Sequence, residues 1–441
     1  MVLKSKTNPS LFSPLPGGQK LLSLARKERV SLINLGCARN LVDSEIILGE
    51  LKQKGASVVN IENADTVIVN TCAFVADAKK ETIDTLLNLI HLKKQKRIKT
   101  IIAVGCFTER YAKVFKKEFP EVDQAFGILP LAKNKNFARA SLTPRSYAYL
   151  KICESCYNHC SFCAIPSIKG KFSSRAMKNI VEEAKELEKR GVKEIDIIGQ
   201  DITAYGLDIY GQKALPRLLK GILKATKKIR WVRLLYAFPG HISDDLLDIV
   251  AKEDRICKYM DLPLQHINDR ILKSMNRGLS RQETVHLVTK IRKKIPGVML
   301  RTAFIVGYPG ETDAEFKELC KFVRDFQFDR VGVFAYSKEE GTKAAQIKNQ
   351  IPDRIKRARY NTLMKIQQGI SSKKMEKFIG RELDVLIDEA DEKDLYAGRS
   401  AYDAPEVDGV VYVTSRRPLK SGDFIRAKVI DASEYDLSAT C

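Results

Sequence analysis

Three cysteines, Cys156, Cys160 and Cys163, follow one another at the spacing C-x3-C-x2-C. Cysteine thiolates hold iron–sulfur clusters, and three of them can hold three irons of a 4Fe–4S cluster. The fourth iron is then open to a substrate or cofactor. A closed structural zinc site has four protein ligands, and Cys153 could supply the fourth thiolate of such a site. The spacing therefore predicts a metal site, and an open 4Fe–4S cluster is favoured over zinc.

A second set of three cysteines lies upstream, and each follows an apolar stretch that is predicted to be a strand. Helical patterns separate these strands, which predicts βαβ units and a parallel sheet. Because ligands bind at the carboxyl edge of such a sheet, the three thiols are expected to converge there. We therefore expect a second three-thiolate site with an open iron. The strands are 30–35, 66–70 and 100–104, and the cysteines that follow them are Cys37, Cys72 and Cys106.

Composition sets the class of protein. The chain has 441 residues and a formal net charge of +22. Its length predicts roughly two to four domains, and its charge favours a polyanionic partner such as nucleic acid or a ribonucleoprotein. Ten cysteines are too few for a disulfide scaffold, and no export signal is evident, so a reducing cytoplasm is expected. No stretch approaches the roughly 18 apolar residues of a membrane helix, so no membrane partner is expected.

The order of the patterns predicts an α/β protein with three folded parts. A flexible basic extension is expected over 1–28, and a parallel α/β domain over 29–140. After a linker at 141–148, repeated strand–loop–helix units over 149–372 predict a partial (β/α) barrel. Short β segments over 373–441 predict a small antiparallel β-barrel of the OB-like kind. The strands expected in the partial barrel are 193–198, 232–236, 258–262, 301–306 and 332–334, and those in the small barrel are 383–387, 396–400, 410–414 and 424–430.

The first motif carries a resemblance to a known family. Cys156, Cys160 and Cys163, with the aromatic Phe162 before the last cysteine, resemble the signature of radical S-adenosylmethionine (SAM) enzymes. This resemblance implies that the open iron binds the amino and carboxylate groups of SAM. An electron from the cluster then splits SAM into methionine and a 5′-deoxyadenosyl radical.

The upstream motifs narrow the resemblance. LGCARNLVDSE, VNTCAFV and AVGC are similar to the three N-terminal cysteine motifs of the methylthiotransferases, and the C-terminal barrel resembles a TRAM domain. The resemblance runs from about Val30 to the C-terminus. It implies that Cys37, Cys72 and Cys106 hold an auxiliary 4Fe–4S cluster that carries the sulfur to be inserted. It also implies two SAM molecules in different roles, and an electron donor such as a small flavoprotein or ferredoxin.

Polar residues at the ends of the barrel strands are the candidates for the wall that binds SAM and substrate. Gln200 and Asp201 follow the strand at 193–198, and Gln265 follows the strand at 258–262. Gly307 follows the strand at 301–306 and permits a tight turn of the backbone. We expect these four residues to contact the cofactor.

Two substrate classes occur in the family: an adenosine in tRNA and an aspartate in a small-subunit ribosomal protein. LPLQHINDRILKSMNRG and FAYSKEEGTKAA resemble the protein-directed branch. The loop GRSAYDAPEVDG carries Asp403, Glu406 and Asp408, which RNA phosphates would repel and a basic ribosomal protein would attract. We therefore expect methylthiolation of the β-carbon of a ribosomal-protein aspartate. The tRNA enzyme, and a non-enzymatic metal-stabilised protein that binds RNA or the ribosome, are the alternatives.

Some residues depart from the family pattern or lie beside the motifs. Ser155 stands where the family usually has glycine, and Ala38-Arg39 replaces the usual Pro-Lys. These differences leave the local loop shape open. Asp43 and Glu45 are expected to cap a helix beginning near Ser44, because acidic side chains suit the positive end of a helix dipole.

Overall fold

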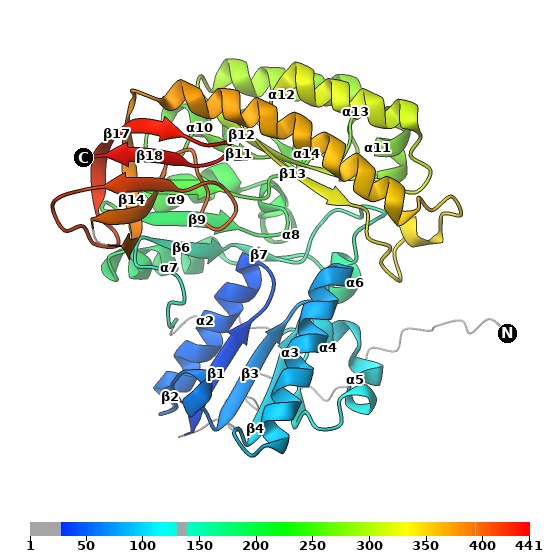
Figure 1. Cartoon of the computed structure of the whole chain (residues 1–441), viewed down its shortest axis with the longest axis vertical. Coiled ribbons are helices and arrows are strands. Elements are labelled where there is room, and N and C mark those ends of the chain that lie inside the picture. Colours follow the sequence, from blue (N-terminus) through cyan, green and yellow to red (C-terminus); the bar gives the residue numbers. More distant parts are fainter. Residues whose placement is uncertain (1–27, 130–138, 393) are drawn as a thin grey trace. The chain divides into compact units, whose positions relative to one another are not determined.

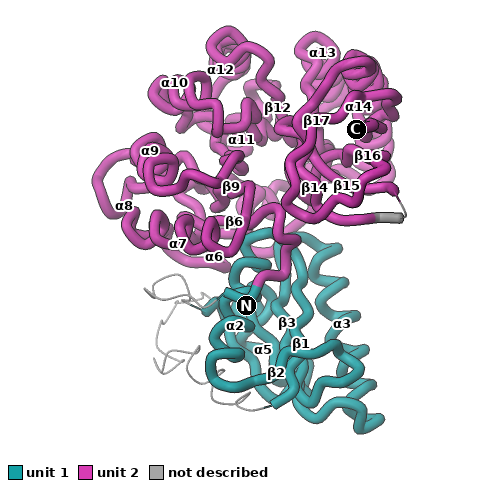
Figure 2. The backbone as a smooth tube through the Cα atoms, turned by 90° about the vertical axis from the view of Figure 1, so that its left-hand side faces the viewer, with its two compact units in different colours: residues 1–140 teal, residues 141–441 magenta. Residues whose placement is uncertain are grey.

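The computed structural model describes residues 28–129, 139–392 and 394–441. The chain divides into two compact units, residues 1–140 and 141–441 (Figure 2). The expected basic extension lies, except for its last residue, outside the described residues.

Unit 1 is a parallel sheet of five strands in the order β2-β1-β3-β4-β5. Every residue of β3 is buried, as expected where helices cover both faces of a parallel sheet. The three strands that precede cysteines are neighbours in this order, so their carboxyl ends share one edge. The strands are β1 (Arg29–Asn34), β2 (Ser57–Val58), β3 (Thr66–Thr71), β4 (Thr100–Gly105) and β5 (Gln124–Ala125); the helices are α2 (Ala38–Gln53), η1 (Ile61–Asn63), α3 (Ala76–Lys94), α4 (Cys106–Arg110) and α5 (Ala112–Glu118).

The prediction that Asp43 and Glu45 cap a helix is wrong. Helix α2 begins at Ala38 with Cys37 as its N-cap residue, and its first turn has no acidic residue. Glu45 lies within the helix, is buried and forms an ion pair with Arg139. A buried carboxylate needs a partner, so Glu45 serves packing rather than the helix end.

Unit 2 contains two three-stranded parallel sheets, β10-β9-β6 and β11-β12-β13. A bridge between Val232 and Ile256 joins β10 to the segment before β11. The six strands and their outer helices form the partial barrel that was predicted (Figure 1). Strand β6 begins at Tyr147, inside the stretch expected to be a linker. The strands are β6 (Tyr147–Lys151), β9 (Glu194–Ile198), β10 (Trp231–Leu234), β11 (Tyr259–Asp261), β12 (Met299–Val306) and β13 (Arg330–Ala335), with a small hairpin of β7 (Cys153–Glu154) and β8 (Ser173–Ser174).

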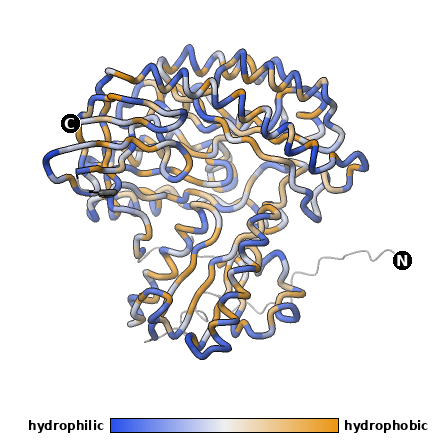
Figure 3. The backbone as a smooth tube through the Cα atoms, in the orientation of Figure 1, coloured by the Kyte–Doolittle hydropathy of each residue, from blue (hydrophilic) through white to orange (hydrophobic). Residues whose placement is uncertain are grey.

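Helices surround this barrel, and apolar segments concentrate on its inner side (Figure 3). A single large core of buried apolar side chains runs from β6 to α14. The helices are α6 (Ile165–Lys169), α7 (Met177–Lys189), η3 (Ile202–Ala204), α8 (Leu207–Tyr210), α9 (Leu215–Ala225), η4 (Pro239–His241), α10 (Asp244–Lys252), α11 (Asp269–Met275), α12 (Arg281–Lys294), α13 (Asp313–Phe326), η5 (Ala344–Gln346), α14 (Asp353–Met375) and η6 (Glu376–Phe378).

The C-terminal strands form a closed five-stranded barrel in the order β14-β15-β16-β18-β17. Four of its strands lie where they were predicted. The fifth, β18, was not predicted; it pairs in parallel with β16 and antiparallel with β17, which closes the barrel. The strands are β14 (Glu382–Glu392), β15 (Leu395–Ser400), β16 (Val411–Thr414), β17 (Phe424–Ala432) and β18 (Leu437–Thr440).

The acidic loop between β15 and β16 is not a free surface. Asp403 is buried and pairs with Arg330 of β13 at 2.6 Å. Asp408 accepts a hydrogen bond from Tyr259 of β11 at 2.6 Å. The charges are satisfied within the chain, so the expectation that Asp403 and Asp408 face a basic partner is wrong.

The same loop and strand β15 also reach β6, β9 and β10 of the partial barrel, at the first residue of β6 and of β9 and at the third residue of β10. The Tyr147 hydroxyl of β6 donates to Glu406 at 2.9 Å, and Arg233 of β10 donates to the Ala401 carbonyl at 2.8 Å. Arg399 pairs with Glu194 of β9 at 2.7 Å. The C-terminal barrel thus closes one end of the partial barrel, opposite to the carboxyl ends of its strands.

Candidate functional site

The three cysteines of unit 1 converge at the carboxyl edge of its sheet. Cys37 follows β1, Cys72 follows β3, and Cys106 begins α4 directly after β4. Gly36 has a φ of +91°, and a Cβ atom there would lie 2.8 Å from both Cβ and Sγ of Cys72. Only glycine lets the backbone at Cys37 come so close to Cys72.

Asn40 ties the three cysteine segments together. Its side-chain amide donates to the carbonyls of Leu35 (3.0 Å) and Thr71 (3.1 Å), next to the first two cysteine segments. The side-chain oxygen of Asn40, Oδ1, lies 4.0 Å from Sγ of Cys106. Asn40 lies within the first cysteine motif, but the motif alone did not predict this role for it.

The thiols of Cys37 and Cys72 in unit 1 interact electrostatically. Burial raises the pKa of Cys72, and the neighbouring Cys37 raises it further. Thiolates that repel one another are relieved when they bind positively charged irons, because metal ligation replaces their protons. The donor set and its convergence therefore fit a cluster held by Cys37, Cys72 and Cys106.

The three cysteines of unit 2 lie on one loop after β7. The Cys163 amide donates to the Cys160 carbonyl at 3.1 Å, which folds the loop back on itself. Burial raises the pKa of Cys156 to about 11 and that of Cys163 to about 12, and both thiols also feel Cys160. Three thiol donors on one short, folded-back loop fit a cluster with three protein ligands.

Two residues donate hydrogen bonds to these sulfur atoms. The Asn158 backbone and side-chain amides lie 3.4 and 3.6 Å from Sγ of Cys156. A guanidinium N–H of Arg277 lies 3.4 Å from Sγ of Cys160. Hydrogen bonds to ligand sulfurs stabilise the negative charge of a cluster. Neither residue was predicted to belong to the site; Asn158 lies inside the cysteine motif, and Arg277 lies inside LPLQHINDRILKSMNRG, a stretch that resembles the family but gave Arg277 no role.

Ser155 explains how this loop works without the usual glycine. Its φ is +61°, a left-handed conformation that glycine adopts most readily. The Ser155 hydroxyl donates to the Gly170 carbonyl at 2.6 Å, which offsets part of the strain.

Asp201 lies beside the loop and bonds to it through Asn158, and its contact with the cofactor stays a prediction. Its carboxylate accepts hydrogen bonds from the Asn158 side chain and from His241, both at 2.8 Å. Burial raises the pKa of Asp201, but hydrogen bonds from His241, Thr203 and Asn158 outweigh burial and hold its pKa below the ordinary value. Asp201 is therefore ionised and orients Asn158 toward Cys156.

Gln200 also faces this region. Its amide nitrogen lies 3.5 Å from Oε1 of Glu154, and its carbonyl oxygen is buried with no hydrogen-bond partner among the described residues. A buried polar atom without a partner is uncommon and marks a place where a ligand can bind.

Gln265 and Gly307 flank the same end of the barrel. Gln265 is half-buried with a φ of +73°, and the carbonyl of Pro263, two residues earlier, accepts a hydrogen bond from Arg277. Gly307 has a φ of +70°, and a Cβ atom there would lie 2.4 Å from the Lys356 side chain. Packing alone therefore explains the glycine at 307, and its contact with the cofactor stays a prediction.

The comparisons with known proteins agree with this geometry. The radical SAM superfamily matches residues 150–323, the uncharacterized protein family UPF0004 matches 29–127, and the TRAM domain matches 379–441. A ribosomal protein uS12 methylthiotransferase RimO from Aquifex aeolicus is 47% identical over 422 residues, covering 93% of this chain and 96% of its own length. The RimO of Desulforamulus reducens is 44% identical, covering 92% of this chain and 98% of its own. The chain belongs to the RimO family of radical SAM methylthiotransferases.

Solved structures were also compared with the chain. It is similar to the radical SAM methyltransferase TsrM from Kitasatospora setae, with a TM-score of 0.49 and 14% identity, over 70% of this chain and 75% of that one. It is similar to the cobalamin-dependent SAM radical enzyme OxsB, also with a TM-score of 0.49, at 11% identity, over 82% of this chain and 60% of that one.

Cys153, the fourth ligand required by the zinc alternative, lies in the core of this RimO-family chain. It is 1% exposed, and a Cβ atom at Gly199 would lie 2.4 Å from its sulfur. Its thiol lies 3.7 Å from the Asp201 carbonyl. Within 28–129, 139–392 and 394–441, no three His, Cys, Asp or Glu side chains are grouped to hold a single metal ion, and this applies to the two cysteine trios as well as to Cys153. Cys153 therefore packs in the core instead of completing a zinc site.

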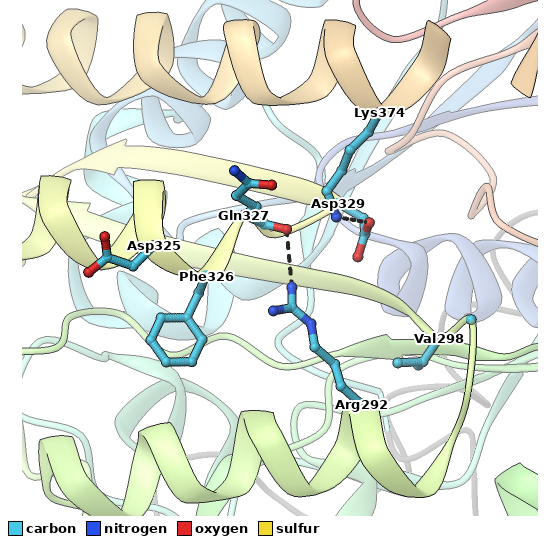
Figure 4. Close-up of a pocket in the computed structure, with 8 residues that line it drawn as sticks. Arg292, Val298, Asp325, Phe326, Gln327, Asp329 and Lys374 are labelled. Carbon is cyan, nitrogen blue, oxygen red and sulfur yellow. Dashed lines mark hydrogen bonds and ion pairs between the residues drawn. The ribbon is translucent and has the colours of Figure 1, made fainter. Parts of the chain in front are cut away.

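A pocket of about 380 Å³ lies elsewhere in unit 2, where the chain enters β12 and β13 (Figure 4). Its charged groups already have partners: Lys374 pairs with Asp329, and Arg292 donates to the Gln327 carbonyl at 3.1 Å. It lies at the amino ends of the strands, away from the cysteines of the RimO motif. In the part of the chain that the structure describes, no helix has the length and apolar character needed to cross a bilayer.

Proposed function

We propose that the protein transfers a methylthio group to the β-carbon of an aspartate in ribosomal protein uS12. The supporting observation is the pairing of two separate three-cysteine sites in a chain that matches RimO relatives over almost its full length. One such site serves ordinary radical SAM chemistry. A second one gives the sulfur a place to be held.

The proposed cofactors are two 4Fe–4S clusters and SAM. Cys156, Cys160 and Cys163 hold the cluster that binds SAM, and Cys37, Cys72 and Cys106 hold the auxiliary cluster. When bound, these groups supply one-electron chemistry at an unactivated C–H bond and the methylthio group itself. The chain's own part is to hold, orient and shield them.

The surrounding residues have distinct proposed roles. Asn158 and Arg277 donate hydrogen bonds to the ligand sulfurs, and Asp201 fixes Asn158. Gln200, with its unpartnered buried oxygen, offers an acceptor to the cofactor. Gln265 and Gly307 complete the proposed wall at the ends of β11 and β12.

The proposed partners are uS12, alone or within the ribosome, and a small flavoprotein or ferredoxin that supplies electrons. The proposed location is the cytoplasm. Because Asp403 and Asp408 are used inside the chain, the choice of protein over tRNA substrate is supported by the RimO relatives and not by the charge of that loop.

The test is an anaerobic reaction. The protein is reconstituted with iron and sulfide and incubated with SAM, a reductant and either uS12 or tRNA. Mass spectrometry is expected to show a methylthio mass shift on uS12 that Cys160→Ala and Cys72→Ala each abolish. A shift on tRNA alone would assign the substrate to the other branch. Zinc binding without SAM cleavage would contradict enzymatic function.

A further inference from the structure

Helix α9 and the loop after it carry an uninterrupted series of basic side chains. Between Asp208 and Asp244 the sequence has no Asp or Glu residue. We call this series the basic strip. Its exposed members are Lys213, Arg217, Lys220, Lys224, Lys227, Lys228 and Arg230.

Most charges of the strip are not neutralised by the chain. Among the described residues, Lys220, Lys224 and Lys227 form no ion pair. The acids of the adjoining helix α7 are occupied by that helix's own lysines, for example Glu182 with Lys185 at 2.8 Å. Glu188 lies at the end of the strip, but its carboxylate accepts hydrogen bonds from backbone amides, including that of Lys227 at 2.5 Å. The positive potential of the strip therefore faces solvent.

The strip connects two functional regions of unit 2. At one end Lys213 donates to the carbonyl of His241, the residue that contacts Asp201 beside the cysteine loop. At the other end the Arg230 guanidinium lies 4.0 Å from the ring centre of Phe424 in the C-terminal barrel. Helix α9 lies on the outer side of unit 2 (Figure 2), and in the sequence it falls between Lys213 and Arg230.

We propose that the basic strip binds the phosphate backbone of RNA between the cysteine loop and the C-terminal barrel. Flexible lysines in a row suit phosphates, which need charge but little shape. Lys220 and Lys224 lie one helical turn apart, about 6 Å, so neighbouring phosphates of one strand can be contacted in turn. The large exposed apolar side chains of the described residues include none between Lys213 and Arg230. Without an apolar centre, the strip fits a nucleic-acid backbone better than a protein interface.

This inference does not depend on the proposed reaction, because RNA binding needs neither clusters nor SAM turnover. The test uses the full chain and a fluorescein-labelled RNA hairpin, with fluorescence anisotropy measured over a range of salt concentrations. The variant combines Lys220→Ala, Lys224→Ala and Lys227→Ala. The matched control combines Lys94→Ala, Lys99→Ala and Lys321→Ala, which removes the same charge from exposed lysines that already have acidic partners and lie outside helix α7.

The strip variant is expected to bind RNA at least about tenfold more weakly near 0.1 M salt, with the slope of log K against log salt reduced by about 2 to 3. The control is expected to stay within about twofold of the unchanged chain. Equal losses in both variants, or none in the strip variant, would overturn the proposal. Loss of binding to an acidic ferredoxin with RNA binding intact would also overturn it. Lys220→Gln with Lys224→Gln repeats the test with polar side chains of similar length.

Discussion

The two cysteine sites are built in opposite ways. In unit 1 each cysteine comes from a different strand of one sheet, 35 and 34 residues apart along the chain. In unit 2 all three cysteines lie on one loop between Cys156 and Cys163. The first site exists only when β1, β3 and β4 are assembled side by side. The second site lies within one short segment of the chain, but the barrel positions residues such as Arg277 that donate hydrogen bonds to its sulfurs.

The difference predicts that the two sites fail for different reasons. Buried ion pairs far from the cysteines stabilise the fold of unit 2. Among them, Glu194 pairs with Arg233 and with Arg399, both at 2.7 Å. In unit 1 the site itself depends on a close approach of the backbone at Gly36 to Cys72.

The largest effect is expected for Glu194→Ala. Removing this carboxylate leaves Arg233 and Arg399 buried without their shared partner, which costs about 3–5 kcal/mol of folding free energy. Calorimetry is expected to show a lower unfolding temperature for unit 2 and an unchanged transition for unit 1. Glu186→Ala, which removes an exposed acid of α7, is the control and is expected to change little. Equal shifts in both variants would contradict the role of the buried network.

The next effect is expected for Gly36→Val. The valine side chain would collide with Cys72, and the residue would keep a strained positive φ. The strain alone lowers the free energy of unfolding by about 1–3 kcal/mol. Iron analysis is expected to show loss of the unit 1 cluster only. The control is Gly211→Val, at a φ of +68° with no atom within 4 Å of the added Cβ, which brings the same kind of strain without the contact. If Gly36→Val kept both clusters, the close approach of Cys37 and Cys72 would not matter for the site.

A smaller, pH-dependent effect is expected from Asp196. Burial raises the pKa of Asp196 well above its ordinary value, and the neighbouring Glu194 raises it further. Between about pH 4 and the raised pKa, the unfolded chain releases this proton and the folded chain keeps it. Stability is therefore lost as pH rises through this window, by at most about 1.4 kcal/mol per pH unit. Denaturant titrations of Asp196→Asn are expected to lack this loss; an identical pH profile would show that Asp196 is ionised when folded.

The smallest effect is expected for Ser155→Gly, which restores the usual family residue. It removes the strain of a positive φ but also the hydrogen bond to Gly170, so the two changes nearly cancel within about 1 kcal/mol. Ser155→Val loses the hydrogen bond and keeps the strain. Thermal unfolding and cluster absorbance are expected to show Ser155→Val as the less stable variant, and equal behaviour would mean that the positive φ at this position costs no stability.

Much of the fold could be predicted because its signals are local. Apolar runs of strand length ended at Cys37, Cys72 and Cys106, and the parallel sheet brought these ends to one edge as expected. The loop cysteines needed only their spacing. The strand β18 was missed because LSAT carries little apolar signal and is defined by its pairing with β16 and β17.

The remaining errors concern partners that are distant in sequence. Asp403 and Asp408 read as a solvent-facing acidic loop, because nothing local indicates that Arg330 and Tyr259 bind them. Arg277 lies more than a hundred residues from Cys160, yet it contacts the sulfur. Such pairs are set by tertiary packing, which local patterns do not encode.

Iron and acid-labile sulfide per chain test the central claim of two separate cluster sites most directly. They are to be measured after anaerobic reconstitution in three proteins: the unchanged chain, a variant with Cys37, Cys72 and Cys106 all changed to Ala, and one with Cys156, Cys160 and Cys163 all changed to Ala. Two clusters predict about eight irons for the unchanged chain and about four for each variant. About four irons in the unchanged chain, lost entirely in one variant and kept in the other, would contradict a second site.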